Sequence, residues 1–383
     1  MADAASGQLT FDPEEEESLG GLFLGVGATT TMREDRTRDG IPMPPAAAPL
    51  LTTRIMLPGR PVKPSRFADG GTVLGQTFDQ ILERARDNTL GLEIGFEQHR
   101  RFARGVQVTG SRLSGLLAVP EVFEPHRAKV DGELLVFAPT SRDIALVGSQ
   151  EPELWVAWSY AVIEYAAALP PGLSPLLYRV VQADDAGSAR LEAWVPAADA
   201  AARKLYERAR LTQLENTYGP MMQDALADQY SYRDGPATVA RPLAAYNADL
   251  DAVLSYAVWN VQDPLPCLVA PTDSIAIDVS GTGEAPQFWI SPDDLSRVPG
   301  VRLTETREFG PPVRVAELTE RTASDELGGL VERLIEHGAR TAAELGGLGE
   351  PASILDWVPS KNGWYGKRAK TATTFPTLQW PHR

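Results

Sequence analysis

Cysteine is nearly absent from the sequence. The chain of 383 residues contains one, Cys267, so it can form neither an intrachain disulfide nor a zinc site made of cysteine ligands. Cys267 stands in an apolar run, where a thiol is usually buried and unreactive. A single thiol suits a reducing compartment, and we expect a cytoplasmic location.

Histidine and catalytic motifs are also scarce. The histidines, His99, His126, His337 and His382, show none of the spacings that hold a metal ion on a helix. The nucleophile motif Gly-x-Ser-x-Gly is missing. We therefore expect no cofactor and no metal, and the sequence favours a protein that is not an enzyme.

Long hydrophobic runs and positive charge are missing as well. The sequence has no run of about 18 apolar residues and no basic region ahead of an apolar one at its start, so we expect neither a membrane span nor a secretory signal. The net charge of −15 disfavours binding to nucleic acid, which needs clustered Lys and Arg.

What is present predicts an α+β protein in four parts. Residues 1–71 are acidic and rich in proline, with seven prolines between Ile41 and Pro64, so we expect them to be largely irregular apart from a strand within 20–31. Residues 72–196 and 197–318 each alternate helical and strand patterns, which predicts two related halves of mixed or antiparallel sheet packed with helices. Residues 319–383 form C-terminal helices and a basic, aromatic tail.

Hydrophobic periodicity and capping residues predict individual elements. Thr77 and Gln80 match a capping box at the start of a helix that Gly91 ends. Two apolar strands flank a turn near Asp184 to Gly187 and indicate a hairpin. Further helices are expected over 151–169, over 197–218 with a break at Gly219-Pro220 and a continuation to 229, and after the capping residue Ser324.

One pattern occurs twice. The stretch LVFAPTSRDIALVGSQEPELWV begins at Leu135, and CLVAPTDSIAIDVSGTGEAPQFWI begins at Cys267. Both place Ala-Pro-Thr between two apolar strands, with Ala138 and Ala270 separated by 132 residues. The match indicates an internal repeat, with chance similarity as the alternative.

The pair Arg142-Asp143 follows the first Ala-Pro-Thr. It could anchor a ligand or take part in catalysis at a strand edge. The alternative is a turn in which Asp143 binds backbone amides and Arg142 is solvated, and the sequence favours this reading because adjacent strand residues point to opposite faces. The second copy has Asp273-Ser274 in place of the charged pair.

The two ends of the chain carry opposite charge. Residues 1–32 contain Asp3, Asp12 and Glu14 to Glu17 and no base, whereas residues 357–383 contain five bases and no acid. Aromatic side chains interleave with the bases of the C-terminal tail and could dock on a protein partner or pack on the chain's own body. The candidate residues for binding a partner are Trp357, Trp364, Tyr365, Lys367, Arg368, Phe375 and Trp380.

Residues 75–295 resemble the YtpQ-like family of uncharacterised bacterial proteins. The resemblance rests on an Ala-x-x-Asn helix end, a Ser-x-Leu-Leu helix and a Gly-Glu-x-Leu-Val strand that leads to a Pro and an Arg-Asp pair. The matching positions are Ala85, Asn88, Leu90, Ser114, Leu116, Leu117, Gly132, Glu133, Pro139, Arg142 and Asp143. The resemblance implies a bacterial, cytoplasmic α+β protein and brings no established activity with it.

Three hypotheses of function follow from the sequence. The leading one is a non-catalytic protein-interaction or regulatory module that binds a protein partner, or a second copy of itself, through its tails. One alternative is a hydrolase or nucleotide-handling enzyme that uses Arg142, Asp143 and nearby carboxylates. The other is a structural subunit of a larger bacterial assembly.

Overall fold

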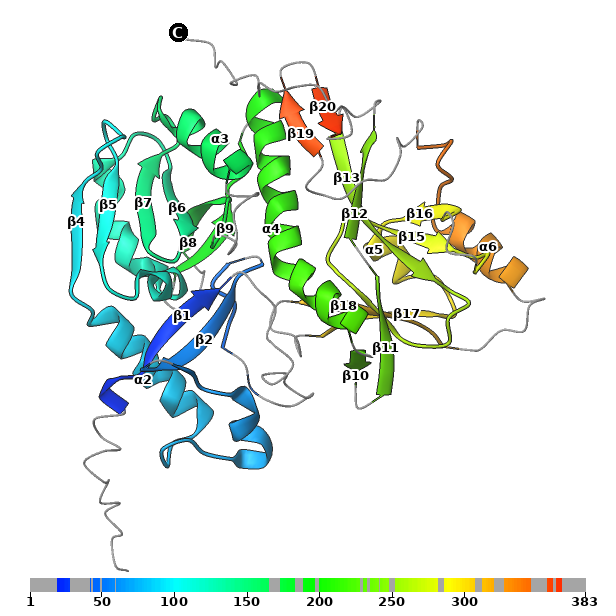
Figure 1. The fold of residues 1–383 in the computed structure, drawn as a ribbon, viewed down its shortest axis with the longest axis horizontal. Helices are drawn as coiled ribbons and strands as arrows, with labels where there is room; N and C mark the ends of the chain where they lie inside the picture. The colour runs from blue at the N-terminus through cyan, green and yellow to red at the C-terminus, as the bar shows by residue number, and fades with distance from the viewer. Residues whose placement is uncertain are drawn as a thin grey trace, which may run out of the picture.

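The chain has an α+β fold of two lobes with one long helix between them (Figure 1). The computed structural model describes residues 19–27, 42, 44–48, 50–58, 60–164, 173–182, 189–196, 200–227, 230–232, 235–240, 242–247, 252–281, 286–306, 312–319, 327–345, 357–360 and 363–366. Five sheets lie in these ranges. The α+β class predicted from the sequence is thereby confirmed. No helix in the described part of the chain has both the length and the apolar character needed to cross a bilayer.

The first lobe is built on a six-stranded antiparallel sheet of strand order β4-β5-β7-β6-β8-β9. Leucine and valine fill β6 and β7 because both faces of these central strands are buried. The predicted hairpin is β8–β9. The strands are β4 Ile94–Gln98, β5 Val106–Gly110, β6 Leu134–Thr140, β7 Asp143–Gly148, β8 Leu177–Gln182 and β9 Ala189–Ala193.

Helices and 3-10 turns cover this sheet. Helix α2 (Phe78–Leu90) begins at the predicted capping box, in which Thr77 and Gln80 bond to each other's backbone amides. Helix α3 (Leu154–Glu164) buries Leu154, Trp158 and Val162, as the spacing predicted. Two 3-10 segments, η3 (Leu113–Ala118) and η4 (Pro120–Lys129), follow β5.

The N-terminal part contains more structure than the sequence indicated. A three-stranded antiparallel sheet of β1 (Phe23–Gly27), β2 (Thr52–Leu57) and β3 (Arg60–Pro61) precedes the 3-10 segment η2 (Pro64–Gly70). The strand expected within 20–31 is β1, whereas the expectation of irregular structure is wrong for β2, β3 and η2. The prolines of this segment made a strand unexpected. Strand β2 lies between Pro49 and Pro58 and contains no proline itself, so all its backbone amides are available for pairing with β1.

Helix α2 holds β1 through polar side chains of its last turn. The Nδ2 of Asn88 donates to the carbonyl oxygens of Leu19 and Leu22, at 3.0 and 2.8 Å. The backbone amide of Leu24 donates to the hydroxyl of Thr89 at 2.9 Å, and Thr89 is fully buried. These bonds attach the N-terminal sheet to the first lobe.

The second lobe consists of two mixed sheets that share an apolar core. Strands β11 and β14 are parallel in the five-stranded sheet, of order β10-β11-β14-β18-β17, and β13 and β15 are parallel in the four-stranded sheet, of order β12-β13-β15-β16. The elements are β10 Tyr230–Tyr232, β11 Gly235–Ala240, β12 Pro242–Asn247, β13 Ala252–Asn260, β14 Cys267–Val269, β15 Ser274–Asp278, β16 Phe288–Ile290, α5 Pro292–Leu295, β17 Val301–Thr306, β18 Val313–Leu318 and α6 Leu327–Glu336.

The two lobes have different topologies. The first has one antiparallel sheet of six strands, and the second has two mixed sheets. The first Ala-Pro-Thr lies in an antiparallel β6–β7 hairpin, whereas the second joins β14 to β15, which belong to different sheets. The two stretches that suggested a repeat therefore fold differently.

Helix α4 (Ala200–Ala227) stands between the lobes (Figure 1). Leu205 and Ala209 pack into the core of the first lobe, while Leu211, Leu214 and Tyr218 pack into that of the second. The predicted boundary at residue 197 therefore falls just ahead of an element that both lobes share. The predicted break at Gly219-Pro220 is wrong, since the helix continues through it; an interior proline removes one hydrogen bond and can kink a helix without ending it.

A short hairpin near the C-terminus packs beside α4. It consists of β19 (Trp357–Ser360) and β20 (Gly363–Gly366), and β19 contacts the helix at the end away from β10 (Figure 1). From the sequence, only helices and a tail were expected in this part of the chain. The Asn-Gly pair at 362–363, which stands between the two strands in the sequence, is a common hairpin signal.

We expect Asn88→Ala to lower the free energy of unfolding by about 1–3 kcal/mol, because the carbonyl oxygens of Leu19 and Leu22 lose their donor. Urea unfolding followed by circular dichroism measures the change. Glu83→Ala, on the exposed side of the same helix, is the matched control and should leave stability within about 0.5 kcal/mol of the parent. An Asn88→Ala chain as stable as the control would contradict the attachment.

Candidate functional site

The pair Arg142-Asp143 lies in the turn of the β6–β7 hairpin, and both residues are exposed. The hydroxyl of Thr140 accepts from the backbone amides of Arg142 and Asp143, at 3.2 and 3.1 Å, and donates to Oδ2 of Asp143 at 2.8 Å. Neither residue lines either of the cavities described below. The pair therefore lies in a turn, as the favoured reading of the sequence had it, but the hydroxyl of Thr140 and not the carboxylate of Asp143 binds the backbone amides.

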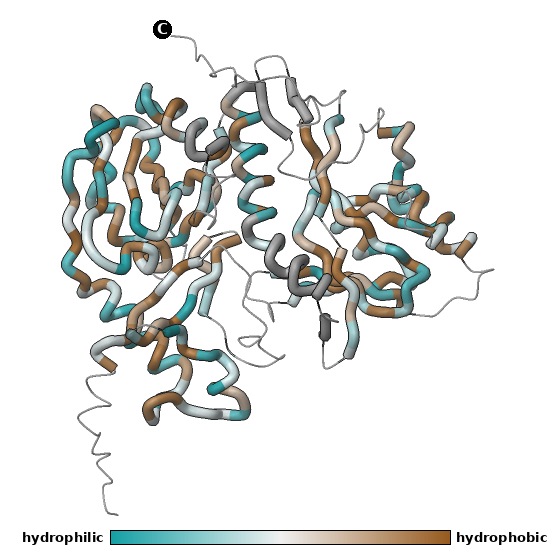
Figure 2. Tube along the Cα trace, in the orientation of Figure 1, coloured by the Kyte–Doolittle hydropathy of each residue, from teal (hydrophilic) through white to brown (hydrophobic). Residues whose placement is uncertain are grey.

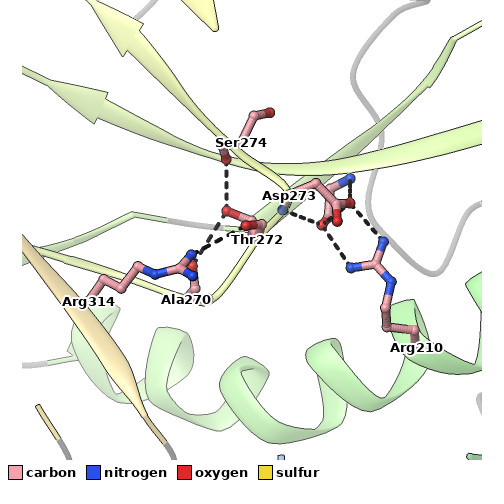
Figure 3. A network of polar contacts seen from close by, with 7 residues as sticks. Arg210, Ala270, Thr272, Asp273, Ser274 and Arg314 are labelled. Carbon is pink, nitrogen blue, oxygen red and sulfur yellow. Dashed lines mark hydrogen bonds and ion pairs between the residues drawn. The ribbon is translucent and has the colours of Figure 1, made fainter. Parts of the chain in front are cut away.

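The second Ala-Pro-Thr leads into a polar cluster that the sequence did not reveal. Oδ2 of Asp273 accepts from Nη2 of Arg210 at 2.7 Å, and from the backbone amide and hydroxyl of Ser255 at 2.9 and 2.7 Å. On the other side of this connection, Arg314 of β18 donates to the carbonyl oxygen of Thr272 at 3.4 Å (Figure 3). The cluster thus joins α4 to the chain where it passes from one sheet of the second lobe to the other.

Two carboxylates have a raised pKa, Glu151 ahead of α3 and Glu207 within α4. Burial raises the pKa of Glu151, which accepts from the backbone amides of Ala103 and Arg104 at 3.3 and 3.0 Å. Burial also raises the pKa of Glu207, whose Oε2 is enclosed without a hydrogen-bond partner among the described residues. Raised pKa values occur at catalytic sites, but Glu151 binds backbone amides and so holds segments together.

The thiol and the histidines have structural surroundings. Burial raises the pKa of Cys267 to about 12. The Nδ1 of His99 accepts from the amide of Arg101 at 3.1 Å, and His126 stacks on Phe96. Within the ranges that the structure describes, no three His, Cys, Asp or Glu side chains gather as a metal site would require.

The candidates for binding a partner fall partly within the described residues. The backbone of Trp357, Trp364 and Tyr365 belongs to the hairpin β19–β20, beside α4. Lys367, Arg368, Phe375 and Trp380 lie outside the described residues. The structure therefore provides a fixed base for the tail and does not place its charged part.

The described residues of the second lobe line two cavities. One of about 440 Å³ lies beside the loop between β13 and β14, and its lining includes Trp259, Arg302 and Glu317. The other, of about 250 Å³, lies over the four-stranded sheet and is lined by Tyr256, Asp273, Asp294 and Arg340 among others. The sequence gave no sign of either, because their polar residues come from segments far apart in the chain.

No family model, no curated protein and no solved structure matches the chain. The resemblance to the YtpQ-like family therefore stays a prediction. Two of its positions have a structural role here, since Asn88 holds β1 and Ala85 is buried in the core.

We expect Asp273→Ala to lower the free energy of unfolding by about 1–3 kcal/mol, because Arg210 and both donors of Ser255 lose their acceptor. Urea unfolding measures the loss. Asp143→Ala serves as the matched control in the other copy of the pattern, since it breaks one exposed hydrogen bond and should change stability by less than about 1 kcal/mol. Equal effects of the two substitutions would count against the linking role of Asp273.

We expect Cys267 to be unreactive in the folded chain. Its side chain is 4% exposed and its pKa is about 12, so the thiolate that reacts with disulfide reagents is nearly absent at pH 8. Titration with a chromogenic disulfide should detect one thiol per chain in 6 M guanidinium chloride and less than about a tenth of that in buffer. Rapid labelling of the native chain would contradict this burial.

Proposed function

We propose that the protein is a non-catalytic interaction module of the bacterial cytoplasm that binds a partner protein through residues 357–383. The observation that carries the proposal is the composition of this segment, which has five basic residues, five large aromatic residues and no acid on a chain of net charge −15. Large aromatic rings and arginine supply most of the binding energy at protein interfaces.

The remainder of the described chain favours binding over catalysis. The Arg142-Asp143 pair forms an exposed turn, the thiol of Cys267 is buried, and the carboxylate of Glu151 binds backbone amides. A catalytic site requires a nucleophile, a base and an oxyanion donor within hydrogen-bond reach of one another. The groups described above are engaged in joining segments of the fold.

The hairpin β19–β20 gives the binding segment a starting point. Its contact with α4 attaches the segment to the helix that both lobes share, so a bound partner would be held against the body of the protein. The positive charge of the segment selects a partner with an acidic surface. A second copy of the chain, with its acidic residues 1–32, meets the same requirement.

The test is capture from a lysate of the source bacterium by the full chain with an N-terminal tag. We expect one partner to be enriched, and a chain that ends at Gly366 to capture at least tenfold less of it. The triple reversal Lys367→Glu, Arg368→Glu and Lys370→Glu should have a similar effect, and 0.5 M NaCl should weaken capture because it screens exposed charges.

The matched control reverses three exposed bases of the first lobe, with Arg100→Glu, Arg101→Glu and Arg142→Glu, and should leave capture unchanged. Thermal unfolding must be equal for all variants. A chain ending at Gly366 that still captures the partner would overturn the proposal. Sedimentation of the purified chain shows whether the partner is a second copy.

A further inference from the structure

A short segment crosses one face of the four-stranded sheet. It begins at Gly338, after α6, and the backbones of Arg340 and Trp289 on β16 bond to each other in both directions, at 2.8 and 2.9 Å. The carbonyl oxygen of Leu345 accepts from Nδ2 of Asn247 on β12 at 2.6 Å. The segment is therefore fixed at both edges of the sheet, and we call residues 338–345 the strap.

The cavity of about 250 Å³ lies between the strap and this face of the sheet. Tyr256 and Ala276 are buried on this face in a cluster separate from the main core, with Trp289 packed against them. A volume of 250 Å³ corresponds to about eight water molecules and is smaller than the pockets that hold drug-sized ligands. The cavity accordingly fits a small metabolite.

Tyr256 supplies the buried polar group of this cavity. Its side chain is 3% exposed, and the described part of the chain offers its hydroxyl no hydrogen-bond partner. Although it has no partner, the hydroxyl oxygen is not fully enclosed by protein atoms, so part of its surface faces open space. Tyr256 lines the cavity, which is that space. Burial raises its pKa to about 12, so the hydroxyl keeps its proton at neutral pH and can donate.

Two side chains of opposite charge, Arg340 and Asp294, also line the cavity. The guanidinium of Arg340 has no hydrogen bond or ion pair within the described residues, and its electrostatic contact is with the exposed carboxylate of Glu344. Asp294 accepts from the hydroxyl of Ser291 at 2.7 Å, and its nearest cation, Arg297, is 3.5 Å away. Its Oδ2 lies 4.0 Å from the place that a Cβ would take at Gly338, which brings it to the start of the strap.

Asp273 also lines the cavity, but its carboxylate is already neutralised. It pairs with Arg210 and accepts two bonds from Ser255, as Figure 3 shows in part. Arg340 and Asp294 are less fully compensated, because Asp294 pairs at 3.5 Å with Arg297, whose side chain is 71% exposed, and Arg340 interacts with the exposed Glu344, so water screens both contacts. A ligand with a single charge would leave one of the two uncompensated as water is displaced.

We infer that the cavity under the strap binds a small zwitterion with an apolar body, of the class of free α-amino acids. The carboxylate of the ligand binds Arg340 and the hydroxyl of Tyr256, and its ammonium group binds Asp294. The apolar body packs on Leu254, Ile290 and Leu345, which complete the lining. This site is separate from the proposed protein-binding segment, since its residues fall between 254 and 345.

The test uses the full chain and five probes, L-alanine, L-valine, L-leucine, L-methionine and L-phenylalanine, by saturation-transfer NMR and titration calorimetry. At least one should bind. For L-leucine the matched analogues are 4-methylpentanoate, which lacks the ammonium group, and 3-methylbutan-1-amine, which lacks the carboxylate. Each should bind at least tenfold more weakly than the parent amino acid, because one charged group of the site stays unpaired. Failure of all five probes, or equal binding of the analogues of the probe that binds, would overturn the inference.

Three substitutions assign the contacts. Tyr256→Phe, Arg340→Gln and Asp294→Asn should each weaken binding about tenfold or more, the loss typical of a hydrogen bond to a charged group. Tyr256→Phe removes only a hydroxyl that bonds to nothing in the described structure, so the chain should fold as before. Arg142→Gln, an exposed arginine of the first lobe, should bind like the parent.

Hydrogen exchange gives a readout that needs no substitution. The bound amino acid should slow amide exchange in residues 252–260 and in the strap, and slowing confined to other segments would overturn the assignment. The chain that ends at Gly366 should bind the same amino acid with unchanged affinity. This result separates the cavity from the C-terminal segment, so either proposal can fail alone.

Discussion

Between Ala202 and Tyr218, helix α4 is largely buried although many of its side chains are polar. The polar residues Lys204, Arg208, Thr212, Gln213 and Thr217 are all at most 9% exposed. Polar groups taken out of water are costly unless they find partners, and the partners that some of them find fix the helix against its neighbours. The carbonyl oxygen of Leu50 accepts from both Gln213 and Thr217, at 3.3 Å each, so the chain just before β2 has a set place along the helix. The rest of the fold is arranged around this requirement.

The same helix joins the two lobes. Polar side chains from its interior bind it to the second lobe, since the hydroxyl of Tyr218 donates to the carbonyl oxygen of Pro312 at 2.6 Å and Arg210 binds Asp273 at the crossing between sheets. Apolar side chains on opposite sides of α4 enter different cores. Removing α4 would expose both cores together, so the lobes depend on one another for stability and should unfold as one unit.

Sequence patterns predicted the elements that have one buried face. The capping box of α2, the buried stripe of α3 and the hairpin β8–β9 contrast polar with apolar positions, and that contrast is what periodicity reports. Helix α4 offers no such contrast, because hydrophilic and hydrophobic residues interleave along it (Figure 2). Its continuation through Pro220 and the pairing of β2 are settled by tertiary contacts. Nothing in the sequence singles out Tyr256, since the strap, more than eighty residues later, forms part of the lining of its cavity.

The Ala-Pro-Thr pattern shows how far a local motif determines function. In both copies the threonine hydroxyl bonds to the chain within the next three residues, with Asp143 in the first and with the carbonyl oxygen of Ser274 in the second. The turn chemistry is therefore local, as short-range side-chain bonds are. The groups that the aspartate after each turn contacts depend on the tertiary fold and not on the local motif. Asp143 closes an exposed turn, whereas Asp273 meets Arg210 of α4 and borders a cavity. The tertiary fold distinguishes the two aspartates, and it gives the linking role to the one that the sequence did not single out.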